Sequence, residues 1–196
     1  INIHFFYHLM GKIGMSKPFV TVGISFFNNE NTLDKAITST INQSYTEWEL
    51  IIIDDGSSDN SFKVANKYRD KRIKLISGKL NRGLVTRLNQ TVELATGKYY
   101  ARMDADDIMH PLRLETQVRY LENVPSVDLV DTNMYSIDET GELVGIRNPP
   151  PADGFSLRSI LYGNVLKHAT VMGRIEWFRM NPYDPLYVRA EDRELW

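Results

Sequence analysis

The chain contains no cysteine, so it has neither a disulfide framework nor a thiolate that could bind a metal or act as a nucleophile. It also lacks an excess of one charge, because 23 Lys and Arg stand against 25 Asp and Glu, a net charge of -2. The cations are scattered as well as balanced, so we expect no nucleic-acid partner. No apolar run approaches the roughly 18 residues of a membrane-spanning helix. These absences favour a cytoplasmic protein, at most in contact with the inner face of a membrane.

Hydrophobic residues are numerous enough for a folded core. They make up 42% of 196 residues, which is the size of one globular domain. Residues 1–14 lack an initiator Met, and we interpret them as a tag or extension rather than a signal peptide. The alternative is an interfacial segment, built from the apolar residues of 5–9, that contacts a membrane peripherally. The chain stops at Trp196 directly after a charged motif, and from this we expect a truncated protein.

Short apolar runs alternate with segments of helical period from Val20 onward. This alternation is typical of an α/β fold with a mostly parallel sheet and helices on both of its faces. Beyond residue 125 the pattern is less regular and indicates an α+β part built onto the same sheet. The predicted strands are 19–26, 50–54, 73–77, 99–103, 127–135 and 143–146, and the predicted helices begin near Asn31, span 60–69, span 84–95 with a stop at Gly97, and begin with Pro111 in their first turn.

Two acidic turns follow predicted strands. One starts at Asp54 and Asp55, and the other is the D-x-D formed by Asp104 and Asp106. In extended chain, side chains at i and i+2 point the same way, so Asp104 and Asp106 could share one divalent cation. A D-x-D alone is weak evidence, because many acidic turns only cap the next helix. Two such turns together favour one shared site, since ligands bind outside the carboxyl ends of parallel strands.

The loop after the first strand can complete a site for a flat ring. The ring of Phe27 offers an apolar wall, and Ser25 and Asp55 offer hydrogen-bond partners for a base. The alternative is that Phe27 is a core residue and that residues 28–30 and 55–59 only cap helices. A dinucleotide site is excluded, because no G-x-G-x-x-G lies between the first strand and helix, and a P-loop is also absent.

The order of these motifs resembles the catalytic portion of a family 2 glycosyltransferase of the GT-A fold. The resemblance implies a Rossmann-like, mostly parallel sheet with a smaller α+β acceptor half. It divides the chain into an extension at 1–16, a nucleotide-sugar-binding half at 17–110 and an acceptor-side half of the same domain at 111–196. The segments that carry it are 20–30, 33–44, 48–61, 81–97, 103–107, 111–114, 165–172 and 190–196.

The family likeness implies an inverting transfer of a sugar from a UDP-sugar to an acceptor hydroxyl. The acceptor would be a sugar or a lipid-linked sugar, in the biosynthesis of a bacterial surface polysaccharide or glycan. Carried over by position, Asp55 would contact the uracil, and Ser25, Phe27 and Glu30 would line the nucleoside pocket. Arg82 stands where many relatives have a small or aliphatic residue, and its guanidinium either reaches the phosphates or sugar, or lies in water.

The same resemblance assigns the reacting groups. Asp104 would face the ribose or the sugar, and Asp106 would hold Mn or Mg, which stabilises the departing diphosphate. Asp192 would be the catalytic base that takes the proton of the acceptor, with Glu191 beside it. His168 would lie on the acceptor-side wall. Without the resemblance, Asp192 would be read as an acidic helix start and His168 as a structural histidine.

Two other functions use the same features. A nucleotide-sugar-binding module without activity would bind a UDP-sugar with metal but would not turn it over. A sugar-phosphate nucleotidyltransferase shares the α/β plan, but it requires a glycine-rich basic first loop. The corresponding loop here, residues 25–30, contains neither Gly nor Arg, which disfavours that reading.

Overall fold

The computed structural model describes residues 19–147 and 166–187. These residues form a six-stranded sheet in the order β3-β2-β1-β4-β8-β5 and a separate two-stranded hairpin, β6-β7. Along the chain the elements are β1 (Val20–Phe26), α2 (Leu33–Ile41), β2 (Trp48–Asp54), α3 (Ser61–Ala65), β3 (Ile73–Ser77), α4 (Leu84–Leu94), β4 (Tyr99–Asp104), α5 (Arg113–Asn123), β5 (Leu129–Val130), β6 (Met134–Ile137), β7 (Leu143–Arg147), the 3-10 turn η2 (His168–Thr170), β8 (Met172–Arg174) and α7 (Ile175–Met180).

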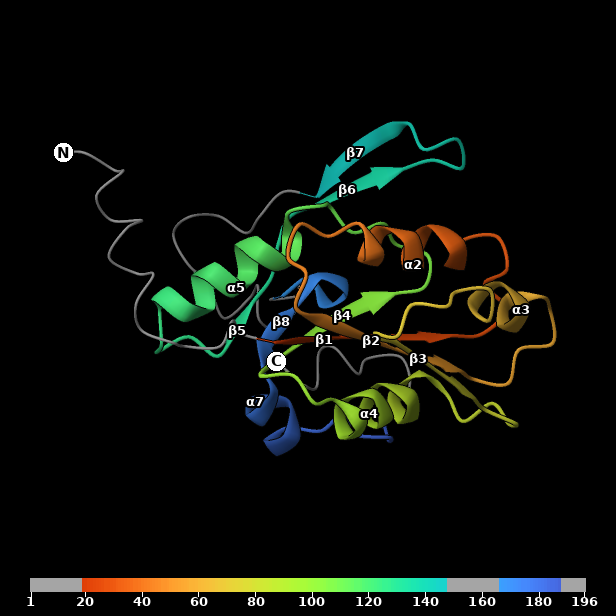
Figure 1. The fold of residues 1–196 in the computed structure, drawn as a ribbon, viewed down its shortest axis with the longest axis horizontal. Helices are drawn as coiled ribbons and strands as arrows, with labels where there is room; N and C mark the ends of the chain where they lie inside the picture. Colours follow the sequence, from red (N-terminus) through yellow and green to blue (C-terminus); the bar gives the residue numbers. More distant parts are fainter. Residues whose placement is uncertain (1–18, 148–165, 188–196) are drawn as a thin grey trace.

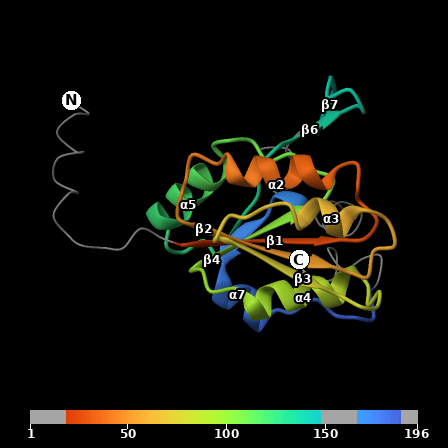
Figure 2. The same cartoon turned by 45° about the vertical axis from the view of Figure 1, so that its right-hand side comes forward.

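Helices cover both faces of the large sheet. Strands β1 to β4 are parallel, and β8 pairs antiparallel with both β4 and β5. Helices α2, α3 and α5 lie on one face, and α4 and α7 lie on the other (Figures 1 and 2). This arrangement confirms the predicted fold class, a mostly parallel α/β sheet.

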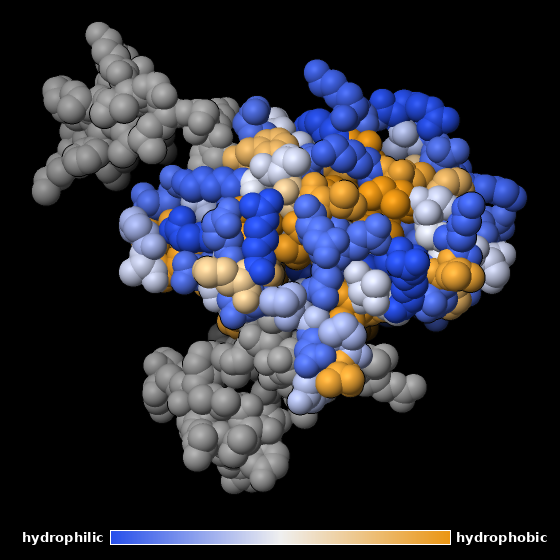
Figure 3. All heavy atoms as spheres, turned by 90° about the horizontal axis from the view of Figure 1, so that it is seen from below, coloured by the Kyte–Doolittle hydropathy of each residue, from blue (hydrophilic) through white to orange (hydrophobic). Residues whose placement is uncertain are grey.

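The central strands are buried on both faces, which explains their continuous apolar sequence. All seven residues of β2 are buried, and Leu33 and Leu114 pack against the sheet from α2 and α5 with no exposed surface. On the opposite face, Tyr100 meets Phe178 of α7 edge to face, with ring centroids 4.9 Å apart. Figure 3, seen from this second side, shows hydrophobic residues gathered at the centre of the surface and hydrophilic residues around them. The core therefore lies in two layers, one on each side of the sheet.

The fourth predicted helix is present, with one difference at its start. Its sequence predicts a buried stripe of Leu114, Val118 and Leu121, and the structure confirms it, because all three are at most 5% exposed. Pro111 was placed in the first helical turn, but α5 begins at Arg113, and Pro111 lies in the turn before it. The second predicted helix, over 60–69, is shorter in the structure than predicted. Helix α3 ends at Ala65, and the chain then turns so that the Tyr68 hydroxyl lies 2.9 Å from Asp34 of α2.

The strand predicted over 127–135 is wrong. The structure has two short strands there, β5 in the large sheet and β6 in the hairpin, separated by residues 131–133. In this break a side chain replaces a neighbouring strand as the partner of the Thr132 backbone. Thr170 Oγ1 accepts a hydrogen bond from the Thr132 N–H and donates one to the Thr132 carbonyl oxygen. The C-terminal part thus joins the sheet through β5 and β8, but not through β6 and β7.

The β6-β7 hairpin projects from the body of the molecule (Figures 1 and 2). Tyr135 pairs with Ile146 across the two strands, and these side chains are 63% and 58% exposed. A bulge between Ser136 and Ile137 shifts the register toward the turn, where Gly141 has a φ of 92°. Within the described ranges, we find no helix long and apolar enough to cross a membrane.

Candidate functional site

The carboxyl ends of β2, β1 and β4 lie side by side at one edge of the sheet. Ser25 of β1 is opposite Ile53 of β2 on one side and opposite Asp104 of β4 on the other. The three loops that follow these strands therefore meet at that edge, as predicted, and bring Asp55 and the acidic turn after β4 to the same end of the sheet.

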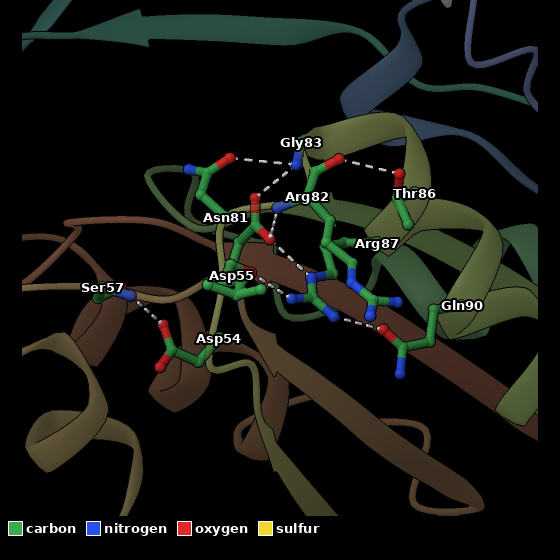
Figure 4. A network of polar contacts seen from close by, with 10 residues as sticks. Asp54, Asp55, Ser57, Asn81, Arg82, Gly83, Thr86, Arg87 and Gln90 are labelled. Carbon is green, nitrogen blue, oxygen red and sulfur yellow. Dashed lines mark hydrogen bonds and ion pairs between the residues drawn. The ribbon is translucent and has the colours of Figure 1, made fainter.

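Asp55 is held rigidly directly after β2 (Figure 4). Its side chain is 6% exposed, and its Oδ1 accepts hydrogen bonds from the Arg82 N–H at 2.8 Å and from Arg87 Nε at 2.7 Å. Its Oδ2 accepts one from the Gly83 N–H at 2.9 Å. A carboxylate has about four acceptor positions, so one position on Oδ2 remains for a further donor.

The turn before α4 takes its shape from a glycine. Gly83 has φ 84° and ψ 157°, a conformation almost restricted to glycine. It lets two consecutive N–H groups, those of Arg82 and Gly83, point at Asp55. The Arg82 side chain is exposed, so only its backbone holds Asp55.

Arg87 of α4, which our sequence analysis did not single out, is the second support of Asp55. All three kinds of guanidinium nitrogen are used: Nε on Asp55, Nη1 on Gln90 at 2.8 Å and Nη2 on the Leu80 carbonyl at 2.9 Å. The guanidinium passes over Gly78, where a Cβ would overlap Arg87 Nη2 and the Asp54 carbonyl oxygen. A side chain at position 78 would displace Arg87, and so this glycine is required for the contact.

The loop after β1 is fastened to the loop after β2. Asn28 is the non-glycine residue with a positive φ (57°) in the described ranges. Its Oδ1 accepts a hydrogen bond from the Ser58 N–H at 2.9 Å. Glu30 Oε2 accepts from the Asn60 N–H at 2.9 Å and from Asn60 Nδ2 at 2.9 Å. Phe27 is 45% exposed, so the alternative that it is a core residue is wrong. Its ring is free to contact a ligand, whereas the Glu30 carboxylate already has a structural role.

The D-x-D has a different geometry from the one we expected. β4 ends at Asp104, and residues 105 and 106 form a turn rather than continuing the strand. The Asp104 carboxylate binds Arg102 through both oxygens, at 2.6 Å to Nη1 and 2.5 Å to Nη2. Asp106 is exposed and makes no hydrogen bond or ion pair with the residues described. The expectation that the chain stays extended through Asp106 is therefore wrong, whereas the sharing of one cation by the two carboxylates stays a prediction.

Asp107 adds a third carboxylate to the turn. Burial, and then the charges of Asp104 and Asp106, raise the pKa of Asp107 to about 6. Arg113 lies close to this cluster and is buried, and burial lowers its pKa to about 10. Its Nη2 donates to the Arg102 carbonyl at 2.9 Å, so it also fixes the end of β4.

The residues of this turn fit a cation that arrives with a diphosphate. In the two described ranges no group of three His, Cys, Asp or Glu has the geometry of a complete metal site. Mg and Mn in nucleotide sites are commonly held by one or two carboxylates, with phosphate and water oxygens as the other ligands. Asp106 is an exposed hard-oxygen donor of this turn, and the nearby carboxylates of Asp104 and Asp107 add negative charge that favours a cation.

His168 faces Tyr183 rather than open solvent. Its Nε2 lies 2.7 Å from the Tyr183 hydroxyl, and the two rings are 5.4 Å apart. Burial, and then the charge of Arg102, lower the pKa of His168 to about 3, so the ring is neutral. Asn89 of α4 fixes Tyr183 by accepting from its N–H at 2.9 Å and donating to its carbonyl at 2.8 Å. The predicted acceptor-side residue is thus a half-buried, oriented histidine whose pKa is lowered in part by Arg102.

The other two predicted residues, Asp192 and Glu191, lie outside the described residues. The described site consists of three parts. They are the Asp55 support, which is Asp55 with Arg87 and the N–H groups of Arg82 and Gly83, the exposed Phe27, and the acidic turn with Arg102. Arg87 and Arg102 of this site, and Tyr183 beside His168, are residues whose roles the sequence did not reveal.

Comparison with known proteins agrees with this geometry. The family model described as "Glycosyl transferase family 2" matches residues 21–186. The chain belongs to this family. EpsE of Bacillus subtilis (strain 168), which bears the name of a glycosyltransferase, is 39% identical over 189 residues, covering 92% of this chain and 66% of that protein. The UDP-Glc:alpha-D-GlcNAc-diphosphoundecaprenol beta-1,3-glucosyltransferase WfgD of Escherichia coli is 31% identical, covering 93% and 70%.

Solved structures of similar proteins confirm the GT-A fold. S. aureus TarS, residues 1–349, superposes on this family 2 chain with a TM-score of 0.74 at 19% identity, covering 90% of this chain and 53% of that one. The mannosyltransferase PcManGT of Pyrobaculum calidifontis, in complex with GDP-Man and Mn2+, gives a TM-score of 0.69 at 19% identity, covering 92% and 51%. The chain therefore spans about half the length of these two structures.

Proposed function

We propose that this family 2 chain transfers a sugar from a UDP-sugar to an acceptor hydroxyl, with inversion and with the help of Mn or Mg. One observation carries the proposal: a buried carboxylate, Asp55, is fixed by three donors at the same sheet edge as the acidic turn after β4. A site for a nucleoside diphosphate needs both, a rigid partner for the base and an acidic turn that can hold a cation.

The base would be recognised by Asp55 and Phe27. The remaining acceptor position on Asp55 Oδ2 suits an N–H donor such as that of a uracil ring. Phe27 is exposed enough to cover a flat ring, and Ser25 is half-buried at the end of β1. TarS has been crystallised with UDP and with UDP-GlcNAc, and WfgD is named for a UDP-Glc donor, which supports a UDP-sugar here. PcManGT carries GDP-Man, so GDP is the competing nucleotide to test.

The diphosphate would lie toward the acidic turn, where Asp106 would hold the cation and Asp104 would face the ribose or the sugar. When bound, the cation would neutralise the charge of the departing diphosphate. Arg82 has an exposed guanidinium beside the Asp55 support, and we assign it to the phosphates or the sugar.

Inversion requires a base on the acceptor side. We assign this role to Asp192, with Glu191 beside it, and it would take the proton from the attacking hydroxyl. His168 is neutral at physiological pH because of its burial, so it can form hydrogen bonds with a sugar without adding a charge. In this proposal residues 17–110 bind the donor, and residues 111–196 bind a sugar or lipid-linked acceptor in the synthesis of a bacterial surface polysaccharide or glycan. The competing proposal is a module that binds the nucleotide sugar without turnover.

Calorimetric titration tests the donor site directly. UDP, GDP and dTDP are titrated into the chain with and without Mn2+, and into Asp106→Ala and the matched control Glu142→Ala, which removes an exposed carboxylate of the hairpin turn. We expect UDP to bind most tightly with Mn2+, the Mn2+ effect to disappear in Asp106→Ala, and the control to behave as the parent chain does. Failure of every nucleotide to bind would refute the donor site.

Turnover separates the enzyme from the binding module. UDP release from UDP-sugars, with hydrolysis or transfer as the source, should be measurable in the parent chain. It should fall by roughly 10² to 10⁴ in Asp192→Asn, the contribution typical of a general base. Tight UDP binding without any release, in the parent chain and the variant alike, would favour the binding module.

A further inference from the structure

Arg102 is a buried cation directly beneath the acidic turn. It lies on β4 two residues before Asp104, its side chain is 4% exposed, and both of its Nη atoms bind the Asp104 carboxylate. The Asp104 side chain is 35% exposed. The pair therefore consists of a cation inside the protein and a carboxylate at the surface, where a ligand approaches.

Arg102 differs from the other buried arginine of the site in how its donors are used. Arg87 satisfies Nε, Nη1 and Nη2 with three different acceptors. In Arg102, Nε is buried and has no acceptor among the described residues. A buried N–H without an acceptor is unfavourable, and most buried donors are paired. Arg102 is thus poorly suited to joining segments through hydrogen bonds, and what it supplies is positive charge next to Asp104.

That charge matters because the turn carries three carboxylates, those of Asp104, Asp106 and Asp107. Among the described residues two arginines lie close to them. Arg113 donates to Gln117 and to backbone carbonyls, and Arg102 is the one of the two that forms an ion pair with a carboxylate of the turn. Without Arg102 the turn would attract a divalent cation more strongly and would repel a diphosphate more strongly.

We propose that Arg102 is a positioning residue that acts through Asp104. It neutralises Asp104, leaves Asp106 as the carboxylate for the cation, and lowers the repulsion between the turn and a diphosphate. A nucleoside diphosphate then binds this chain measurably even without a divalent cation. The inference rests on the proposed function, because it requires the diphosphate to lie at this turn.

The test measures three affinities by calorimetry: Mn2+ alone, UDP in EDTA, and UDP with saturating Mn2+. The variants are Arg102→Met, which keeps an unbranched side chain in the buried position, and Arg102→Lys, which keeps the charge. The matched control is Arg72→Met. Arg72 also pairs with an aspartate two positions away, Asp70, but at the opposite end of the sheet, directly before β3.

Two affinities should change in opposite directions in Arg102→Met. Mn2+ alone should bind more tightly because Asp104 is released, and UDP in EDTA should bind more weakly, each on the order of tenfold for one unit charge at this range. In Arg102→Lys, UDP binding in EDTA should stay within about threefold of the parent chain. Arg72→Met should change neither affinity.

Other results would overturn the inference. A purely structural role predicts that Arg102→Met weakens Mn2+ and UDP binding together, or leaves both unchanged. If Arg102→Met does not fold, Arg102→Gln replaces it as the neutral variant, and the same two opposite changes are expected; any other pattern contradicts the inference. If the parent chain binds UDP only with Mn2+, the inference alone fails. If it binds no nucleotide under any condition, the proposed function fails as well.

Discussion

Nε of Arg87 lies 2.7 Å from Oδ1 of Asp55, and each of these two side chains is only 6% exposed. The pair connects helix α4 to the end of strand β2, 32 residues apart in the sequence. The same carboxylate is the group that we assign to the base of the nucleotide. Recognition of the base and the stability of this sheet edge therefore depend on one ion pair.

Arg87→Met tests this dependence. It should lower the free energy of unfolding by about 3 kcal/mol, because removing one partner leaves the Asp55 charge buried. The loss should lie at the lower end of the range for such pairs, since two backbone N–H groups still bind Asp55. Urea unfolding measures the stability, and UDP titration should show at least a tenfold weaker affinity, roughly 1.4 kcal/mol.

A surface ion pair is the control for this prediction. Arg179 pairs with Glu176 on α7, and their side chains are 45% and 70% exposed. Arg179→Met should change the free energy of unfolding by less than about 1 kcal/mol, because exposed pairs contribute little. Equal losses in Arg87→Met and Arg179→Met would show that burial of the Asp55 pair does not have the effect we assign to it.

The parallel part of the fold could be predicted because burial on both faces leaves a local signal. The strand predicted over 73–77 has the observed bounds of β3, and the others of the first four differ by at most two residues at either end. The break between β5 and β6 could not be predicted, because it depends on Thr170, about 38 residues further along the chain, replacing a strand as hydrogen-bond partner. Local sequence does not reveal such a partner.

The sequence predicted the carboxylates of the site but not the arginines that bind them. The carboxylates were visible because they follow apolar runs, and the family likeness gave them roles. The arginines that hold these carboxylates could not be identified from the sequence, because an arginine on a helix or strand is usually exposed. Arg87 and Arg102 become buried only when Asp55 and Asp104 meet them in the fold. The ion pair that occupies Asp104 was missed for this reason, and the D-x-D geometry was wrong because the chain turns directly after Asp104.

Gly78 leaves the space that the Arg87 guanidinium needs in order to reach Asp55. Gly78→Ala should destabilise the chain by about 1–3 kcal/mol, because the new methyl group overlaps the Asp54 carbonyl oxygen and Arg87 Nη2. It should also weaken UDP binding by displacing Arg87. Gly145→Ala is the matched control, since its Cβ would lie 3.7 Å from Ser136 in ordinary contact. Thermal unfolding compares the two, and an equal response would contradict the steric argument.

Arg82 separates the role of a backbone from that of a side chain. Its N–H holds Asp55, but its guanidinium is exposed. Arg82→Ala should leave the free energy of unfolding within about 0.5 kcal/mol, as expected for a surface substitution. If the guanidinium contacts the phosphates or the sugar, the affinity for a UDP-sugar should fall roughly tenfold, about 1.4 kcal/mol. Unchanged affinity would mean that this side chain lies in water.

Asn89 connects α4 to the segment that carries Tyr183. Its amide forms hydrogen bonds with both the N–H and the carbonyl oxygen of Tyr183, a residue that is 2% exposed. Asn89→Ala leaves both groups without this partner and should cost about 1–3 kcal/mol. Asn89→Asp keeps an acceptor for the N–H but sets a carboxylate oxygen against the Tyr183 carbonyl oxygen, so its loss in urea unfolding should be at least as large as that of Asn89→Ala. The reverse order would refute the bidentate contact.

The half-buried His168 predicts how stability depends on pH. Burial, followed by the charge of Arg102, lowers the pKa of His168 to about 3, below the ordinary value of 6.5. Between these two values the unfolded chain binds a proton that the folded chain does not, so stability should fall as the pH falls below about 6.5. At pH 5 the contribution is about 2 kcal/mol, from 1.36 kcal/mol per pKa unit.

His168→Gln isolates this contribution, because glutamine does not titrate and can still form a hydrogen bond with Tyr183. Urea unfolding at pH 7.5, 6 and 5 should show a smaller loss of stability for the variant than for the parent chain, with the difference growing as the pH falls. At pH 7.5 both forms of the residue are neutral, so any difference there reports packing alone. Parallel pH profiles would show that His168 takes up its proton in the folded chain as readily as in the unfolded one.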